Sequence, residues 1–454
     1  MHAYALVFHA RARVLAEELG ENMVKKTKFL SHIDEKSGLH MHLRLNPDGT
    51  GVLVINASKV IYLNKTAAFY VEQMFKGASP RDAAKRARRR FKNITLEEAE
   101  QDYKDVVNKI LSLAFSKVCP ISSLGFHRID PFIFKPSAPY RVDLALTYDC
   151  NNACIHCYSS SPRKNSIKEL STKQWVKVID KLFNVGVPYV SFTGGEPTLR
   201  PDLEELVAYA QKKGLVTGLV TNGRKLSNAQ YLHKLVEAGL DSIQITLESP
   251  DPEVHDKITG VKGSWKETVE GIKNTVKENI YLDVNMTLTR LNIGQVEKWV
   301  TFLSELGVEN ISVNKLIYSG KALKLVKDLE PSLSEVKEVL AKIKELAEDY
   351  GMKFTWYGVT RYCELNPLEL DLGIKTCSAA LLTLAIEPDG TVIPCQSYFV
   401  PVGNILKDKW DKIWFNELCV KLRNRDYAPQ KCRRCPHFQV CGGGCPLEVK
   451  QFSP

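Results

Sequence analysis

The feature that most constrains the fold is a regular alternation of apolar strands and amphipathic helices between residues 142 and 356. Such alternation favours a parallel sheet whose outer face is covered by helices. Six strand–helix pairs precede a final strand, so a partial (β/α)6 barrel is expected rather than the eight-unit TIM barrel. The expected strands are residues 142–147, 189–192, 216–220, 242–247, 281–288, 310–314 and 353–356, and the expected helices are residues 172–185, 203–212, 228–238, 265–277, 296–306 and 333–350.

Three cysteines follow the first of these strands directly. They are Cys150, Cys154 and Cys157, in the spacing C-x3-C-x2-C. Proteins built on a parallel sheet bind their ligands at the carboxyl ends of the strands, and this loop is expected to lie there. A structural zinc site normally has four protein ligands, whereas this loop has three thiols. Three thiolates on a four-iron cluster leave one iron open to a cofactor or substrate. A zinc loop and a set of buried thiols without a metal are the alternatives.

The second strand ends in Thr193-Gly194-Gly195-Glu196-Pro197. Paired glycines let backbone approach a ligand closely, and a carboxylate can pair with an ammonium group. C-x3-C-x2-C after the first strand, followed by Gly-Gly-Glu-Pro after the second, resembles the radical S-adenosylmethionine (SAM) superfamily. The resemblance implies a 4Fe-4S cluster whose open iron holds SAM, and reductive cleavage of SAM to a 5′-deoxyadenosyl radical. It also implies that Gly194, Gly195 and Glu196 bind the SAM amino group.

Later strand ends carry further polar residues. Thr221 and Asn222 close the third strand and are compatible with SAM binding. Asn285 and Arg290, near the fifth strand, are candidates for contacts with the SAM ribose or carboxylate, and a structural role is the alternative for each. Relatives commonly carry Ser-Leu-Asp-Gly where the fourth strand here ends in Thr-Leu-Glu-Ser, which leaves the role of Glu248 open. No catalytic acid or base is identified.

Eight of the twelve cysteines lie between residues 363 and 445. A hairpin with its turn at Asp389-Gly390 precedes Cys395, and C-x2-C-x5-C-x3-C follows. This pattern resembles the SPASM domain, which carries auxiliary iron–sulfur clusters in radical SAM enzymes, whereas C-x2-C alone would favour a zinc ribbon. By this resemblance, one auxiliary cluster is held by Cys377, Cys395 and Cys445, and a second is held by Cys432, Cys435 and Cys441.

The resemblance to the SPASM domain is incomplete. The usual final cysteine is missing before the end at Pro454, and position 383 is a threonine. Each auxiliary cluster therefore has a non-cysteine ligand or an open iron, or only one cluster forms. Cys363, His437 and Glu448 are candidate substitutes.

Residues 39–116 form a separate segment. Three short strands precede helices over residues 66–76, 79–91 and 96–113, an α+β, winged-helix-like order. The segment resembles the small chaperone domain of pyrroloquinoline quinone biosynthesis, which implies recognition of a peptide leader by strand addition. A purely structural winged-helix domain or a dimerisation module is the alternative. The expected organisation is an extension at 1–38, this domain at 39–116, a linker at 117–140, a radical SAM core at 141–358 and a SPASM-like domain at 359–454.

Charge and hydropathy limit the partners. The net charge is +10, and the densest basic run, residues 85–90, is expected to be a solvated helix face. The sequence lacks a groove motif in which aromatic residues alternate with basic ones, so nucleic acid is not expected as a partner. No run of about 18 apolar residues and no signal peptide is present, so a cytoplasmic location and no membrane partner are expected. The resemblance further implies a ferredoxin or flavodoxin as electron donor.

The predicted function is modification of a ribosomally made peptide or protein, by crosslinking or side-chain oxidation, by an oxygen-sensitive radical SAM oxidoreductase. Maturation of a non-peptide cofactor such as a tetrapyrrole is the alternative enzyme. An iron–sulfur electron carrier or scaffold is the alternative that is not an enzyme.

Overall fold

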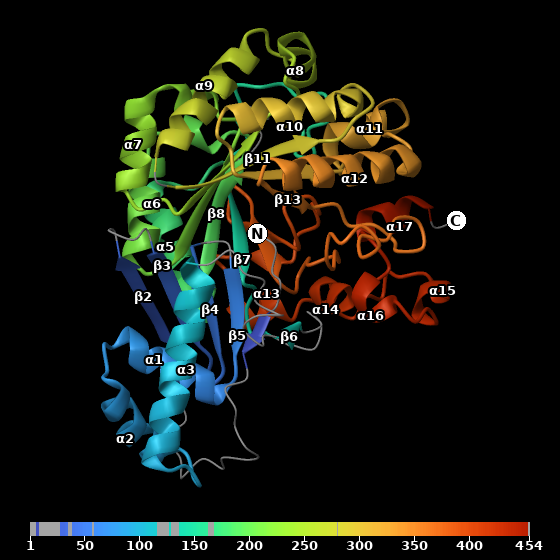
Figure 1. Cartoon of the computed structure of the whole chain (residues 1–454). Helices are drawn as coiled ribbons and strands as arrows, with labels where there is room; N and C mark the ends of the chain where they lie inside the picture. Colours follow the sequence, from blue (N-terminus) through green and yellow to red (C-terminus); the bar gives the residue numbers. More distant parts are fainter. Residues whose placement is uncertain are drawn as a thin grey trace. The chain divides into compact units, whose positions relative to one another are not determined.

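The computed structural model describes residues 6–8, 28–34, 39–56, 59–115, 127–128, 136–161, 168–278 and 280–452. The chain divides into two compact units. Unit 1 comprises the chain up to Phe134 together with Asn184–Pro188, and unit 2 comprises the remainder. Figure 1 shows the chain and labels many of its helices and strands.

Unit 1 contains a six-stranded sheet in the order β2-β3-β4-β5-β1-β6. The strands β2 to β5 are successive antiparallel neighbours, whereas β1 pairs parallel with β5. The three strands expected in this segment are confirmed as β3, β4 and β5. The strands are β1 (Leu6–Phe8), β2 (Lys28–Asp34), β3 (Leu39–Leu45), β4 (Gly51–Ile55), β5 (Lys59–Leu63) and β6 (His127–Arg128).

Two strands of this sheet, β1 and β2, come from the segment expected to be an extension. All seven residues of β2 pair with β3, from Lys28 opposite Leu45 to Asp34 opposite Leu39. The alternation of apolar residues in β2 is too weak to indicate a strand, so pairing with the more regular β3 defines it. Most of the expected linker lies outside the described residues, apart from β6 and residues 136–140.

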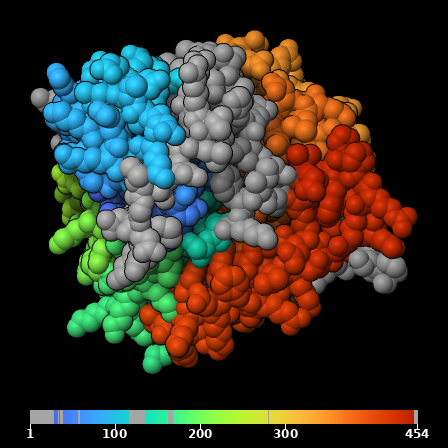
Figure 2. Space-filling view, turned by 90° about the horizontal axis from the view of Figure 1, so that it is seen from below, coloured from blue at the N-terminus to red at the C-terminus, as the bar shows by residue number. Residues whose placement is uncertain are grey.

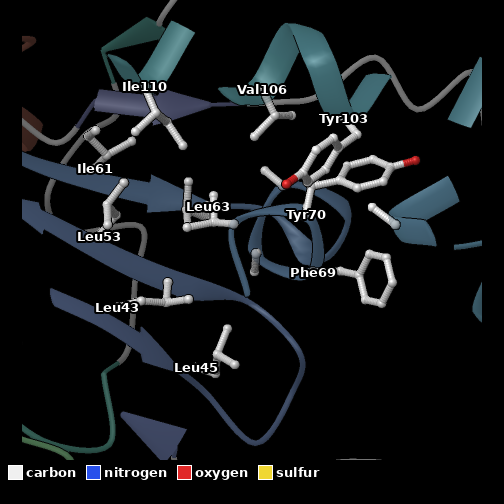
Figure 3. Packing of buried hydrophobic residues seen from close by; sticks show 14 of the residues in the cluster. Leu43, Leu45, Leu53, Ile61, Leu63, Phe69, Tyr70, Tyr103, Val106 and Ile110 are labelled. Carbon is white, nitrogen blue, oxygen red and sulfur yellow. The ribbon is translucent and has the colours of Figure 1, made fainter. Parts of the chain in front are cut away.

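Three helices cover unit 1, as expected: α1 (Lys65–Phe75), α2 (Pro80–Arg90) and α3 (Leu96–Phe115). Asn64 and Ser79 cap the first two helices by accepting backbone hydrogen bonds. Strand residues such as Leu53 and Ile61 belong to the same buried cluster as Tyr70 of α1 and Tyr103 of α3 (Figure 3). The two tyrosine rings meet edge-to-face at 6.0 Å. In α2 only alanines are buried and the basic side chains of residues 85–89 are exposed, which confirms the expected solvated face, while Arg90 is half-buried over the Phe69 ring.

Unit 2 is built on a ten-stranded sheet in the order β13-β12-β11-β10-β9-β8-β7-β14-β15-β16. The strands β7 to β13 are parallel neighbours, which confirms the expected partial barrel. These strands are β7 (Arg141–Thr147), β8 (Tyr189–Gly194), β9 (Val216–Thr221), β10 (Ser242–Thr246), β11 (Tyr281–Thr287), β12 (Asn310–Asn314) and β13 (Lys353–Trp356).

Helices lie along the outer side of this curved sheet (Figure 1). They bury apolar faces such as Trp175, Val178 and Leu182 of α5. Two of them, α8 and α11, are additional to the expected helices. The helices are α5 (Thr172–Val185), α6 (Leu203–Lys212), α7 (Ala229–Glu237), α8 (Pro252–Thr259), α9 (Ser264–Lys277), α10 (Val296–Glu305), α11 (Gly320–Leu329) and α12 (Leu333–Asp349), with 3-10 turns η1 (Pro197–Leu199), η2 (Arg224–Ser227) and η3 (Ile293–Gln295).

Several buried strand positions on the barrel side of the sheet are polar. Asp143 lies opposite Ser191, and Gln244 lies opposite Asp283 and donates a 2.6 Å hydrogen bond to it. Complete barrels are usually filled there by branched aliphatic side chains. The polar interior places hydrogen-bonding groups beneath the carboxyl ends of the strands.

The C-terminal segment continues the same sheet, because β14 (Thr383–Ile386) pairs parallel with β7. It forms the expected hairpin with β15 (Thr391–Ile393), and Gly390 has a φ of +85° in the turn. The segment, coloured red, has a continuous surface beside the orange helices of unit 2 (Figure 2). None of the described helices is both long and apolar enough to cross a membrane. The remaining elements are β16 (Gly403–Asn404), α13 (Trp410–Trp414), α14 (Glu417–Arg423), α15 (Gln430–Arg433), α16 (Phe438–Cys441) and α17 (Pro446–Phe452).

Candidate functional site

A cavity lies at the carboxyl ends of the parallel strands of unit 2. It has a volume of about 1070 Å³, including the space at its mouth. Its walls combine the cysteine loop after β7, the ends of β8 to β12 and one residue of the C-terminal segment. The lining residues are Cys150, Asn152, Cys154, His156, Cys157, Tyr158, Ser159, Ser161, Thr193, Gly194, Gly195, Val220, Thr221, Asn222, Gln244, Thr246, Glu248, Thr259, Asn285, Thr287, Asn314, Ile317 and Gln396.

The end of α8 holds the cysteine loop. Backbone N–H groups of Ala153 and Ile155 donate to the carbonyls of Thr259 and Ile258, at 2.8 and 3.0 Å. Gly260 follows with a φ of +72°, and a Cβ there would lie 2.8 Å from the Ala153 carbonyl oxygen. The loop is therefore anchored through its backbone, which leaves its thiols free to face the cavity. The sequence pattern of this segment does not indicate α8.

The three predicted thiols of this loop all line the cavity. Burial raises the pKa of Cys150 to about 12 and that of Cys154 well above its usual value. Backbone N–H groups of Asn152 and Ser161 lie 3.4 and 3.3 Å from the sulfurs of Cys150 and Cys157. Hydrogen bonds of this kind stabilise sulfur ligands of iron. Without iron the thiols of Cys150 and Cys154 stay protonated, so cluster binding must displace their protons.

Among the described residues, no group of three or more His, Cys, Asp or Glu side chains is arranged around a single metal ion. A four-iron cluster places each thiolate on a different iron, so its ligands stand farther apart than those of one ion. Three thiols on one wall, two of them accepting N–H hydrogen bonds, fit a cluster of this kind.

The two glycines at the end of β8, Gly194 and Gly195, are required by close backbone packing. A Cβ on Gly194 would lie 2.1 Å from the Thr147 carbonyl oxygen, and one on Gly195 would lie 2.4 Å from that of Asp149. The N–H groups of Gly195 and Glu196 donate to these same two carbonyls at 2.8 Å. The glycines thus join the ends of β7 and β8, and both also line the cavity.

Glu196 is fully buried and is not among the cavity-lining residues. One carboxylate oxygen accepts hydrogen bonds from the Thr198 and Thr221 hydroxyls, both at 2.7 Å, and from the Thr198 N–H at 3.1 Å. The other accepts the N–H of Asn222 at 2.8 Å. Burial raises the pKa of this carboxyl, and these hydrogen bonds oppose the rise. Its expected pairing with an ammonium group stays a prediction.

The other predicted cofactor contacts separate into two groups. Thr221, Asn222 and Asn285 line the cavity, and Asn285 Nδ2 donates to Ser312 at 2.9 Å. Arg290 is exposed and does not line the cavity. An arginine that sequence analysis did not single out, Arg224, reaches the cysteine loop and donates to Asn152 Oδ1 at 3.0 Å.

A histidine–carboxylate pair was also missed. His156 Nε2 lies 3.1 Å from Glu248 Oε1, and Glu248 Oε2 accepts the N–H of Thr287 at 3.1 Å. His156 Nδ1 is buried without a hydrogen-bond partner among the described residues, on a side chain that lines the cavity. The N–H of Glu248 donates to His255 Nδ1 at 3.2 Å. The departure of Glu248 from the common Ser-Leu-Asp-Gly pattern was the available signal.

The C-terminal cysteines gather in two places. Burial raises the pKa of Cys395 to about 12, with a further rise from a negative charge on Cys377. Burial and the charges of Cys377, Glu448 and Cys395 raise the pKa of Cys445 well above its usual value. These three thiols therefore lie within electrostatic reach of one another. The next residue after Cys395, Gln396, lines the cavity and accepts a 3.3 Å hydrogen bond from the Tyr158 hydroxyl.

The second group contains Cys432, Cys435 and Cys441. Burial is the main cause that raises the pKa of Cys432, and negative charges on Cys363 and Cys441 raise it further. Cys435 is exposed at the turn after α15, and its N–H donates to the Cys432 carbonyl at 3.0 Å. Glu448, a candidate substitute ligand, forms a 3.0 Å ion pair with Lys315, and His437 is exposed.

Comparison with known proteins agrees with this arrangement. Residues 144–303 match the radical SAM superfamily, and residues 377–436 match the SPASM iron–sulfur cluster-binding domain. The chain is 29% identical over 322 residues to the mycofactocin maturase MftC of Mycobacterium tuberculosis, covering 70% of this chain and 80% of MftC. It is 29% identical over 325 residues to the Fe-coproporphyrin III synthase of Methanosarcina barkeri, covering 66% and 81%.

Among solved structures, Streptococcus suis SuiB bound to its precursor peptide SuiA aligns with a TM-score of 0.64. The alignment covers 94% of this chain and 96% of SuiB at 18% identity, so it shows a shared fold.

Proposed function

Because this chain is a radical SAM enzyme with 4Fe-4S clusters and a SPASM domain, we propose that it modifies a ribosomally made peptide recognised by unit 1. The bound cluster and SAM supply one-electron reduction and a hydrogen-abstracting radical. The chain's own residues bind and orient these groups and shape the space for the substrate.

The observation that carries the proposal is that a residue next to the C-terminal cysteine Cys395 meets the cysteine loop at one cavity. Tyr158 follows Cys157 directly, Gln396 follows Cys395 directly, and the two side chains hydrogen bond across the cavity wall at 3.3 Å. A substrate held there would lie between the SAM-binding cluster and an auxiliary cluster. Crosslinking or oxidation of a side chain removes electrons from the substrate, and a second cluster close to the cavity suits that requirement.

In this proposal the predicted cysteine ligands and the predicted residues that line the cavity have stated tasks. Cys150, Cys154 and Cys157 hold the SAM-binding cluster. Gly194 and Gly195 present backbone to SAM, alongside the polar side chains of Thr221, Asn222 and Asn285. Cys377, Cys395 and Cys445 hold one auxiliary cluster, while Cys432, Cys435 and Cys441 hold the other.

Unit 1 is proposed to bind the leader of the peptide. Its terminal strand β2 pairs with β3 over seven residues, and an extended peptide could continue this sheet by strand addition. The relative MftC is named as a maturase, and SuiB was solved with a precursor peptide, which supports a peptide substrate here. We also propose a cytoplasmic location and a ferredoxin or flavodoxin as electron donor.

One relative favours a second candidate. Fe-coproporphyrin III synthase has the same 29% identity as MftC, so a tetrapyrrole substrate is the alternative function. It differs in one testable respect, because a tetrapyrrole has no leader for unit 1 to recognise.

The test is co-expression with a short peptide encoded beside this chain, followed by mass spectrometry of the peptide. We expect a mass change that needs SAM and a reductant and is lost when the leader is removed. The matched control is a peptide with its leader intact and the residues of its core replaced by alanine. Conversion of a coproporphyrin by the same preparation, with no change in the peptide, would overturn the proposal and favour the alternative.

A further inference from the structure

The second auxiliary cysteine group has three predicted ligands, one fewer than a fully cysteine-ligated four-iron cluster. Of the three candidates for the missing ligand, Glu448 and His437 do not reach this group. Glu448 forms its ion pair with Lys315 at 3.0 Å, and its charge acts on Cys445, which belongs to the first group. His437 is exposed on the turn between Cys435 and Cys441, and none of the described contacts joins its side chain to a thiol.

A turn at residues 361–364 lies against this group, although it is far from it in sequence. The N–H of Tyr362 lies 3.4 Å from Cys441 Sγ. An added Cβ on Gly444 would lie 2.8 Å from Arg361 Cγ, so the turn also packs on the glycine run after Cys441. The next residue of the turn is Cys363, whose thiol is exposed.

The turn itself is well anchored. The N–H groups of Glu364 and Leu365 donate to the Arg361 carbonyl at 2.8 and 3.0 Å, and the Thr360 hydroxyl donates to the Leu365 carbonyl at 2.8 Å. The Tyr362 hydroxyl accepts the N–H of Lys375 at 3.0 Å. Cys363 is therefore held in a fixed turn, one residue from the backbone N–H that lies against Cys441 Sγ.

We propose that Cys363 is the fourth ligand of the auxiliary cluster held by Cys432, Cys435 and Cys441. Cys363 lies before residue 377, where the match to the SPASM domain begins. The ligand thus comes from the segment between the barrel and that domain, and the cluster ties this segment to the loop that carries C-x2-C-x5-C. Both Cys363 and Cys435 are exposed, so this cluster has a solvent-facing side.

The first test counts iron in a background without the SAM-binding cluster. With Cys150, Cys154 and Cys157 replaced by alanine, only C-terminal iron remains in the anaerobically reconstituted full chain. We expect Cys363→Ala to lower the iron and sulfide content of each chain. The loss should be about one to four iron atoms, from one iron up to the whole cluster. Cys435→Ala is the matched ligand variant, and Cys419→Ala, which removes a buried thiol of α14, should leave the iron content unchanged.

The second test does not depend on cluster loss. Iodoacetamide should label Cys363 readily in the iron-free chain, because this thiol is exposed, and should label it several-fold less after reconstitution. Peptide mapping by mass spectrometry gives both extents of labelling for the same residue. Equal labelling of Cys363 in both forms would overturn the assignment, even if iron content fell in the variant. A Cys363→Ala chain that keeps Cys150, Cys154 and Cys157 should still cleave SAM. This activity separates failure of the Cys363 assignment from failure of the enzyme assignment.

Discussion

Glu196 accepts a 2.8 Å hydrogen bond from the backbone N–H of Asn222, so the carboxylate after β8 fixes the end of β9. The same side chain accepts the Thr221 hydroxyl at 2.7 Å. Two of the cavity-lining polar residues are therefore placed by a carboxylate that does not line the cavity itself.

Replacement of Glu196 by alanine should both destabilise the fold and weaken SAM binding. The change leaves buried donors of Thr198, Thr221 and Asn222 without an acceptor. Unsatisfied buried groups cost about 1–3 kcal/mol each, so we expect a total loss of several kcal/mol. Urea unfolding and calorimetric titration with SAM would measure the two effects. A variant with native stability that has lost only SAM affinity would instead favour direct pairing with the SAM ammonium.

Gly194→Ala should disrupt the join between β7 and β8. Its Cβ would lie 2.1 Å from the Thr147 carbonyl oxygen, at a φ of +140° that side chains rarely adopt. We expect a loss of about 3 kcal/mol or more in the free energy of unfolding. Gly294→Ala is the control, because no atom lies within 4 Å of its added Cβ, and it should change stability by less than about 0.5 kcal/mol. Equal stability of the two variants in thermal unfolding would contradict this account.

His255 should make stability depend on pH in the acid range. Burial lowers its pKa from 6.5 to about 4, so the folded chain holds this histidine neutral. Its Nδ1 accepts the N–H of Glu248, which also requires an unprotonated nitrogen. The contribution of neutral His255 to the free energy of unfolding is fully present above pH 6.5. It falls by about 3 kcal/mol as the pH drops toward 4, because the histidine of the unfolded chain binds its proton at a higher pH than that of the folded chain.

Unfolding of the wild-type chain and of His255→Gln between pH 7 and 4 would measure this contribution. The variant should lose less stability on acidification than the wild type. His233→Gln, at a histidine whose side chain is 56% exposed, is the control variant. Parallel pH profiles for wild type and His255→Gln would show that His255 does not carry the effect.

The long periodic elements could be predicted from the sequence, and the contacts between distant segments could not. The barrel strands and the loop of Cys150 follow local patterns, so their order was predicted correctly. The short helix α8 carries no strong periodicity, yet it anchors the cysteine loop through Thr259. The pairing of β14 with β7 and the hydrogen bond between Tyr158 and Gln396 join residues far apart in the chain.

Contacts of individual side chains could not be predicted for the same reason. Gly-Gly-Glu-Pro was expected to face a cofactor, but the interactions of Glu196 within the chain become visible only once β8 and β9 are adjacent. Arg290 follows β11 in sequence, while its side chain is exposed to solvent. His156 and Glu248 come from different strand ends and meet only in the folded barrel.

The central claim is that Cys150, Cys154 and Cys157 hold a cluster that cleaves SAM. The most direct measurement is release of 5′-deoxyadenosine from SAM by the anaerobically reconstituted and reduced protein. We predict release by the wild type, no release by Cys150→Ala, Cys154→Ala or Cys157→Ala, and residual release by Cys435→Ala. A colourless wild-type protein that contains only zinc and releases no 5′-deoxyadenosine would contradict the account.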